Sequence, residues 1–345
     1  MENYTDALNR LRQRRNPEDM MLFEAYGKLQ EEDSIKYIVG SMAEIDPAYT
    51  AKTYEEAERV QNQITKGLDR HSIAAEYEYQ GSVTKNTHIR AYSDVDVLAL
   101  EKRFVTVEAP QKAEPRYAGN PTADLIQIRE IADETLKAAF PEAIVDSSKS
   151  KCINIEGGSL VRSVDVVPAN WYDTNDYART QKKVFRGVHL LDYHKQTREE
   201  DVPFLHGEHL DIRDRQFDGN VRRVVRLCKS LKYDSGRKDM PSSYDIESII
   251  YRMPDGDLGW TLGQELQLSA ACHRWLDRLL ANAILRESLD VPDGKRKIFA
   301  DGHTTVEQLS GLHDELGRVL ADVERGLARS SRKLADARLE APLVN

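Results

Sequence analysis

Two aspartates stand one residue apart in an apolar segment, and their carboxylates are the first candidates for chemistry. In "SDVDVLAL", Asp94 and Asp96 would share one face of a β-strand, because side chains at positions i and i+2 point the same way. Val95 and Val97 would then face the core. Two unpaired carboxylates this close repel each other, so one pKa rises unless a cation lies between them. Mg²⁺ is suited to that place, because it binds carboxylates together with substrate phosphate oxygens.

A third aspartate lies in a later segment with the same pattern. In "RSVDVVPA", Asp165 is flanked by Val164 and Val166, so its side chain also leaves the apolar face. Three acids on adjacent strands would form a two-metal site that activates an attacking hydroxyl and stabilises a leaving pyrophosphate. A bare Asp-x-Asp pattern is more often a solvated strand edge or a turn. The third acid, the apolar flanks and an upstream Gly-Ser pair favour the catalytic interpretation.

The combination "GS…SDVDVL…VDVVPA" resembles the nucleotidyltransferase fold of the DNA polymerase β superfamily. In that superfamily the Gly-Ser turn and a following short helix bind the donor triphosphate, because glycine lets the backbone approach phosphate and a helix start offers free N–H donors. The resemblance implies that Gly81 and Ser82 hold phosphate. It also implies that Asp94 and Asp96 carry two Mg²⁺ ions, with Mn²⁺ as an alternative, and that Asp165 binds the ion nearest the acceptor hydroxyl.

A second informative stretch is "RLCKSLKY", followed shortly by "SSYDIESI". The first part predicts an amphipathic helix in which Arg222, Arg226 and Lys229 share the polar face. Taken alone, this pattern favours a helix with solvated basic residues. In the second part, Ser242 and Asp245 fit the S-x-x-D pattern of a helix start.

Together these two segments resemble oligoadenylate synthetase, cyclic GMP-AMP synthase and their bacterial relatives, the cGAS/DncV-like nucleotidyltransferases or CD-NTases. The resemblance extends from residue 60 to residue 255. It implies that Lys229 and Ser243 contact the donor triphosphate and that Tyr244 stacks on its base. An ammonium group suits phosphate and an aromatic face suits a purine. ATP, GTP or both are the implied substrates, with other NTPs as alternatives.

Composition limits the classes of function. The 345 residues are 40% hydrophobic and 31% charged, which is typical of a globular chain. No apolar run reaches the ~18 residues that span a bilayer, and the first residues lack a signal-peptide core, so we expect no membrane partner and a cytoplasmic protein. A net charge of −9 argues against a long nucleic acid as the main partner. The three cysteines are far apart and are expected in the core.

We expect either basal activity or regulation by another protein, rather than activation by nucleic acid. His206, His209, Cys272 and His273 are too scattered to replace the zinc insertion of the DNA-sensing animal enzyme. Activation by nucleic acid is therefore not expected. Some relatives have their C-terminus conjugated by a partner enzyme, so the resemblance allows a regulatory or C-terminus-conjugating protein partner.

The pattern of elements predicts an α+β fold: a polymerase β-like nucleotidyltransferase core, with a mixed sheet and helices, plus a helical C-terminal lobe across a central cleft. We expect spine-like N-terminal helices over 1–75, the catalytic core over 76–175, a helical substrate-binding lobe over 176–330 and a mobile tail over 331–345. Strands are predicted over the following segments: 75–81, 94–109, 143–148, 151–156 and 160–169. Helices are predicted over these: 17–45, 49–74, 122–140, 191–201, 216–234, 242–252, 261–288 and 303–330.

The expected function is a Mg²⁺-dependent synthase that makes a cyclic di- or trinucleotide second messenger from NTPs, with release of pyrophosphate, in antiphage signalling of the CBASS type. One alternative is a template-independent nucleotidyltransferase that makes linear oligonucleotides or tails RNA; the acidic charge disfavours it. An alternative of another class is a catalytically silent nucleotide-binding regulatory module. Base choice, linkage and ring size do not follow from the sequence.

Overall fold

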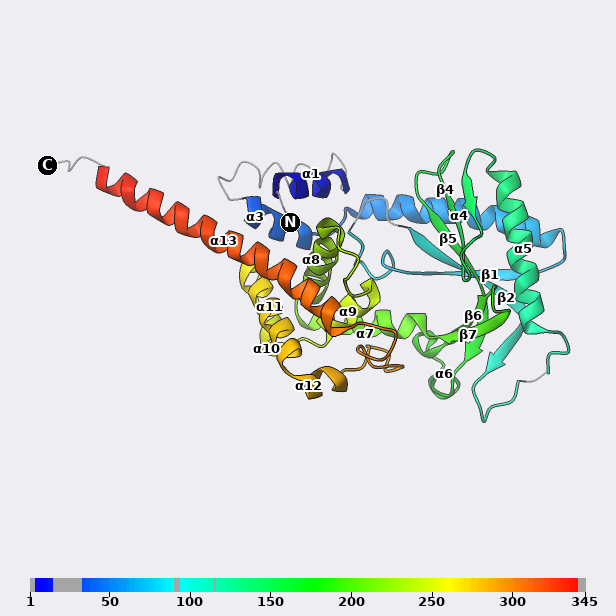
Figure 1. The fold of residues 1–345 in the computed structure, drawn as a ribbon. Coiled ribbons are helices and arrows are strands. Elements are labelled where there is room, and N and C mark those ends of the chain that lie inside the picture. Colours follow the sequence, from blue (N-terminus) through cyan, green and yellow to red (C-terminus); the bar gives the residue numbers. More distant parts are fainter. Residues whose placement is uncertain (1–3, 15–32, 90–93, 114–115, 341–345) are drawn as a thin grey trace. The chain divides into compact units, whose positions relative to one another are not determined.

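The structure is a computed structural model that describes residues 4–14, 33–89, 94–113 and 116–340. The chain forms two compact units. The first, here called the helical unit, comprises residues 1–44 and 212–345, and the second, the sheet unit, comprises residues 45–211. Figure 1 shows the elements of both units.

The sheet unit contains a seven-stranded mixed sheet with two long helices. Its elements are α4 (Pro47–Asp69), β1 (Ala75–Gln80), β2 (Val95–Val107), α5 (Pro121–Ala139), β3 (Ile144–Asp146), β4 (Ile153–Glu156), β5 (Val164–Asp173), α6 (Asn175–Thr180), the 3₁₀ helix η1 (Lys183–Phe185), β6 (Gly187–Asp192) and β7 (Thr197–Asp201). α7 (Pro203–Gln216) begins in this unit.

β2 and β5 pair in parallel, and every other strand pair of the sheet is antiparallel. The strand order is β1-β2-β5-β4-β3, and β6 pairs with both β5 and β7. α4 and α5 cover one face of the sheet, where Val95, Val97 and Ala99 of β2 pack in one apolar cluster with residues of both helices (Figure 1). Leu98 and Leu100 point to the opposite face and join a separate cluster. The expected α+β fold with a mixed sheet is confirmed.

The expectation of a helix over 191–201 is wrong, because this segment forms a β-hairpin from β6 and β7. Val188 and Leu190 of β6 pack in the apolar cluster on the face opposite α4 and α5, and β6 pairs with β5. Gln196 turns the chain with a φ of 52°. The segment "TREED" is polar and has little strand preference, so pairing with β6 determines its conformation.

The helical unit consists of helices of several lengths. Its described elements are α1 (Tyr4–Arg14), α3 (Asp33–Met42), α8 (Asn220–Ser235), α9 (Ser243–Tyr251), α10 (Asp255–Leu258), α11 (Glu265–Ala281), α12 (Ala283–Ser288) and α13 (Val306–Glu340). The helix predicted over 261–288 is divided at Asn282, whose side chain caps the start of α12 by accepting from the Leu285 N–H. α13 continues past residue 330, where the sequence predicted the end of the helix.

The part of the helix predicted over 17–45 that lies at residues 17–32 falls outside the described residues, and α3 forms the described remainder. The domain limits predicted at residues 75, 175 and 330 stay a prediction. Among the described residues, no helix combines the length and the apolar character that crossing a membrane requires.

Candidate active site

Two of the three predicted acids lie on the central strands of the sheet unit, and the third immediately precedes one of these strands. Asp96 is the second residue of β2 and Asp165 the second residue of β5, and the two are direct partners in the parallel register. Asp94 stands immediately before β2 and is exposed. The valines on both sides of Asp96 and of Asp165 pack against α4 and α5. Because side chains alternate along a strand, both carboxylates point to the face without these helices.

Burial and the neighbouring carboxylates both disfavour the ionised form of Asp96. Burial, then the charge of Asp165, then that of Asp94 raise the pKa of Asp96 to about 7 from an ordinary value of 3.8. Lys85 and Lys149 oppose this rise without cancelling it. The carboxylate cluster therefore carries more negative charge than its surroundings compensate, which is the condition that a bound cation relieves.

Two polar side chains hold Asp165. Asn154 stands opposite Asp165 in the register of β4 with β5, and its Nδ2 donates to Asp165 Oδ1 at 2.6 Å. Lys149 precedes β4, and its Nζ lies 3.6 Å from Asp165 Oδ2. The amide fixes the rotation of the carboxylate, and the half-exposed lysine supplies a positive charge at the other oxygen.

The Gly-Ser pair follows β1 directly and packs against the acids. Gly81 has a φ of +96°, and a Cβ built on it would lie 2.6 Å from Asp96 Oδ2. Glycine is therefore required here both for the backbone conformation and for the close approach of Asp96. Ser82 starts a series of turns over residues 82–86, which Thr84 closes by donating its hydroxyl to the Gly81 carbonyl at 3.0 Å. The short helix that the resemblance implied after Ser82 is absent from the described residues 82–89.

Cys152 is the nearest potential soft ligand to the acids, but it stays a thiol. Burial and then the charge of Asp165 raise its pKa to about 12. Cys228 and Cys272 are buried in the helical unit as the sequence predicted, with their sulfur atoms 3.9 Å apart, and all three cysteines are free. The ligand set that the sheet presents is therefore made of carboxylate oxygens, which suits a hard divalent cation such as Mg²⁺.

Lys229 lies in α8, and the polar face of this helix is not solvated. Lys229 Nζ lies 3.4 Å from Glu247 Oε1 of α9, and both side chains are buried. Arg226 is buried to 2% exposure and donates to the Met42 carbonyl at the end of α3 at 2.8 Å. Arg222 pairs with Asp214 at 2.9 Å. The interpretation of these residues as a solvated basic face is wrong, because neighbouring helices cover that face and compensate its charges.

Ser243 and Tyr244 open α9. Ser242 caps this helix by accepting from the Asp245 N–H at 3.0 Å, as the S-x-x-D pattern predicted, and Ser243 is exposed. Tyr244 is half-buried; its hydroxyl donates to Asp293, and the guanidinium of Arg296 lies 5.1 Å from the centre of its ring. Arg296 is itself held by Asp245 at 2.6 Å.

Sequence reasoning missed four residues near the predicted ones: Asn154, Lys149, Glu247 and Arg296. Asn154 alone had a readable signal. It occupies the strand position opposite Asp165 once "IEGGSL" is taken as the turn of an antiparallel hairpin. The others become neighbours only through loop and helix packing.

Known proteins with related sequences and folds share one activity. No family model matches the chain. It is 35% identical over 298 residues to the cyclic dinucleotide synthase CdnE of Yersinia aleksiciae. This alignment covers 85% of this chain and 78% of that protein. It is 30% identical over 330 residues to a c-di-GMP synthase of Capnocytophaga granulosa, with 87% of this chain and 91% of that protein covered.

The structural comparison agrees with the sequence comparison. The STING-associated CdnE c-di-GMP synthase from Capnocytophaga granulosa superimposes with a TM-score of 0.77 and 28% identity, over 94% of this chain and 99% of that one. The agreement extends over both units and includes the sheet on which the three acids lie. The chain therefore belongs to the CD-NTase family, the metal-dependent nucleotidyltransferases that make cyclic oligonucleotides from nucleoside triphosphates.

Proposed function

We propose that this enzyme joins two molecules of GTP into c-di-GMP, with release of two molecules of pyrophosphate, at the site formed by Asp94, Asp96 and Asp165. The observation that carries the proposal is the direct pairing of Asp96 with Asp165 across two strands, with Asp94 one position before β2. The choice of GTP is supported by the relative from Capnocytophaga granulosa, which is a c-di-GMP synthase.

The acids fit two Mg²⁺ ions, with Mn²⁺ as an alternative. Their donor atoms are all carboxylate oxygens. Burial, then the charges of Asp165 and Asp94, raise the pKa of Asp96, and a divalent ion would offset this cost of the ionised form. Asp94 and Asp96 would hold both ions, and Asp165 the ion nearest the acceptor hydroxyl. Bound Mg²⁺ favours ionisation of that hydroxyl and neutralises charge on the leaving pyrophosphate.

The chain's own residues orient the reaction. Asn154 holds Asp165 in one rotation through Oδ1, and Oδ2, which lies 3.6 Å from Lys149 Nζ, is the oxygen proposed to face the acceptor side. A ribose hydroxyl of one nucleotide attacks the α-phosphorus of the other; the new O–P bond forms, the bond to pyrophosphate breaks, and the hydroxyl proton leaves to solvent. A second transfer of the same kind closes the ring.

The donor nucleotide is proposed to contact residues that the resemblance identified. Gly81 and Ser82 would hold phosphate oxygens at the turn beside Asp96. Lys229 and Ser243 would contact the triphosphate, and Tyr244 would stack on the base. In the structure Lys229 pairs with Glu247, and the Arg296 guanidinium lies over the Tyr244 ring. A bound phosphate would therefore share Lys229 with Glu247 or replace Glu247, and a bound base would share the Tyr244 ring with Arg296 or replace Arg296.

We further propose that the product acts in antiphage signalling of the CBASS type; the relative from Capnocytophaga granulosa is described as STING-associated. A regulatory protein, or one that conjugates the C-terminus, is the proposed partner. Activation by nucleic acid is not part of the proposal, in keeping with the net charge of −9.

The test is a product analysis with each NTP alone and with all four together, using α-³²P-labelled substrate, Mg²⁺ and mass spectrometry. We expect a phosphatase-resistant product with the mass of c-di-GMP from GTP alone. The Asp94→Ala/Asp96→Ala variant should make none, whereas Asp176→Asn, a surface change in the same unit, should leave the yield unchanged. The Asp176 side chain is 61% exposed, and the described contact of its carboxylate is with Arg179.

Other outcomes would identify the alternatives. A phosphatase-sensitive product would indicate a linear oligonucleotide synthase or an RNA-tailing enzyme. A cyclic product that requires ATP would retain the enzyme class and reject the choice of GTP. Binding of NTPs without turnover, with several metals present, would indicate a catalytically silent module.

A further inference from the structure

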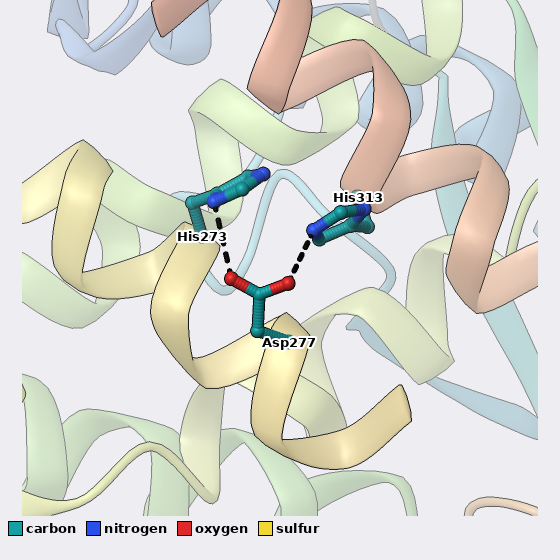
Figure 2. Close-up of side chains that lie close together, drawn as sticks. All are labelled: His273, Asp277 and His313. Carbon is teal, nitrogen blue, oxygen red and sulfur yellow. Dashed lines mark hydrogen bonds and ion pairs between the residues drawn. The ribbon is translucent and has the colours of Figure 1, made fainter. Parts of the chain in front are cut away.

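A cluster of two histidines and one aspartate lies in the helical unit, on elements that contain none of the eight residues predicted for catalysis or nucleotide binding. His273 and Asp277 are one helical turn apart on α11, and His313 comes from α13. Figure 2 shows both imidazole rings turned toward the Asp277 carboxylate. One ligand atom from each residue lies within 4.8 Å of the others. Among the described residues, this is the one group of histidine, cysteine and acidic side chains with such spacing.

The distances are close to those of a coordinated ion. His313 Nε2 lies 2.7 Å from Asp277 Oδ1, and His273 Nδ1 lies 3.5 Å from Asp277 Oδ2. Ligand atoms around a tetrahedral zinc ion lie about 3.3 Å apart, given Zn–N and Zn–O bonds of about 2.0–2.2 Å. Small rotations of the side chains would therefore bring the three atoms to coordinating positions. The i, i+4 spacing of His273 and Asp277 places two ligands on one helix face.

His313 lies between two carboxylates. Its Nε2 lies 2.7 Å from Asp277 Oδ1, and its Nδ1 lies 3.3 Å from Asp314 Oδ1. A carboxylate on the outer nitrogen is the usual support of a metal-bound histidine.

The second histidine is packed in place. The rings of His273 and His313 are stacked, with centroids 4.2 Å apart and an angle of 25° between planes. A Cβ built on Gly317 of α13 would lie 2.8 Å from His273 Nε2, so only glycine leaves room for this ring.

We propose that His273, Asp277 and His313 bind one divalent transition-metal ion, for which Zn²⁺ is the best match, and that this ion joins α11 to α13. Two imidazoles and a carboxylate form a ligand set that prefers Zn²⁺ and its neighbours in the first transition row to Mg²⁺. The Asp277 side chain is 54% exposed, so the ion can enter from solvent and water completes its coordination. The role is structural, because both helices pack together and the site fixes one against the other.

The experiment uses the full-length chain without a histidine tag and in the Asp94→Ala/Asp96→Ala background, which removes the catalytic carboxylates as competing ligands. The protein is stripped with a chelator and titrated with Zn²⁺ against a chromophoric chelator. Co²⁺ absorption in the visible range gives an independent reading of the ligand set. We expect one equivalent of Zn²⁺ to bind and the melting temperature to rise with it, because an ion that binds only the folded state stabilises that state.

Asp277→Asn and His313→Ala should each weaken Zn²⁺ binding by at least about tenfold and remove the rise in melting temperature. His303→Ala, a change of an exposed histidine just before α13, is the matched control and should bind as the parent does. A parent protein that binds no Zn²⁺ overturns the proposal. Equal binding, or an equal rise in melting temperature, in the Asp277→Asn and His313→Ala variants overturns it too.

Discussion

The charged groups around Lys229 in the helical unit and around Asp96 in the sheet unit differ in how far the fold compensates them. In the helical unit, buried ionic groups have partners: Lys229 faces Glu247, and Asp234 accepts from Tyr37 at 2.8 Å and from Arg10 at 3.2 Å. In the sheet unit, Asp96 lies beside two further acids, and the nearby lysines leave its pKa raised to about 7. Charge that is compensated within the fold supports structure, whereas charge that the fold leaves uncompensated marks the place where a ligand binds.

The largest expected effect is on activity in the sheet unit. Asp165→Asn keeps the size of the side chain but removes its charge, so the rate of product formation should fall by about a thousandfold or more, equivalent to about 4 kcal/mol of transition-state stabilisation. The melting temperature should not fall with it. Asp176→Asn serves as the control at the surface of the same unit. Retention of more than a tenth of the activity by Asp165→Asn would remove this residue from the site.

The largest effect on stability should come from the helical unit. Lys229→Met removes the ammonium group that faces the buried Glu247 carboxylate, which should lower the free energy of unfolding by about 3–5 kcal/mol. Adding Glu247→Leu removes the second charge and should restore most of that loss. Urea denaturation measures both variants.

The same pair of variants separates structure from function at Lys229. If Lys229 contacts the donor triphosphate, the Lys229→Met/Glu247→Leu variant stays folded but has a raised KM for GTP. If the double variant regains both the stability and the KM for GTP of the parent, Lys229 has only a structural role.

A smaller effect is expected from substituting Gly81. It separates the cost of the backbone conformation from the cost of a contact with Asp96. Gly81→Ala and Gly219→Ala both place a side chain at a positive φ, of +96° and +84°, at a cost of order 1–3 kcal/mol each. Only at Gly81 does the new Cβ meet the Asp96 carboxylate, and nothing lies within 4 Å of it at Gly219. We therefore expect both variants to melt earlier, and only Gly81→Ala to require more Mg²⁺ for half-maximal activity. Equal Mg²⁺ requirements would contradict the close packing of the turn on Asp96.

The smallest effect concerns pH in the absence of metal. The pKa of Asp96 is about 7 in the folded chain against 3.8 ordinarily, so between these values the folded state binds more protons than the unfolded state. Stability must then decrease as pH rises through this window and level off above about 7. Asp96→Asn lacks this dependence, so in EDTA its melting temperature should exceed that of the parent by a few degrees at pH about 7.5, and by less at pH about 5.

Adding Mg²⁺ also tests whether uncompensated charge at Asp96 lowers stability. It should raise the melting temperature of the parent at neutral pH and should leave Asp96→Asn little changed. A parent stability that does not vary with pH in EDTA would contradict the electrostatic repulsion among the acids.

Local patterns were sufficient for the acids and for most elements. Alternation of apolar and acidic residues predicted β2 and β5 together with the faces of Asp96 and Asp165, because a period of two has a direct geometric meaning. The glycines after β4 predicted its hairpin with β5. The helix α9 and its cap at Ser242 also followed from composition and spacing.

What could not be predicted depends on contacts between distant segments. The polar face of α8 is covered by α3, almost two hundred residues earlier, so a wheel of the helix alone suggested exposure to solvent. β7 is a strand because β6 pairs with it, although its residues are mostly charged. The group of His273, Asp277 and His313 combines residues of two helices whose packing has no local signal.

The parallel pairing of β2 with β5 also makes the proposed catalysis by Asp96 and Asp165 a test of correct folding. A shift of either strand by one residue would exchange its two faces, burying an acid beneath α4 and α5 and exposing a valine in its place. The alignment of backbone hydrogen bonds thus sets the separation of the Asp96 and Asp165 carboxylates. No side-chain rotation can bring them together when a strand is misaligned. A sample's specific activity therefore reports the fraction of molecules whose central strands are correctly aligned, even where compactness and helix content look normal.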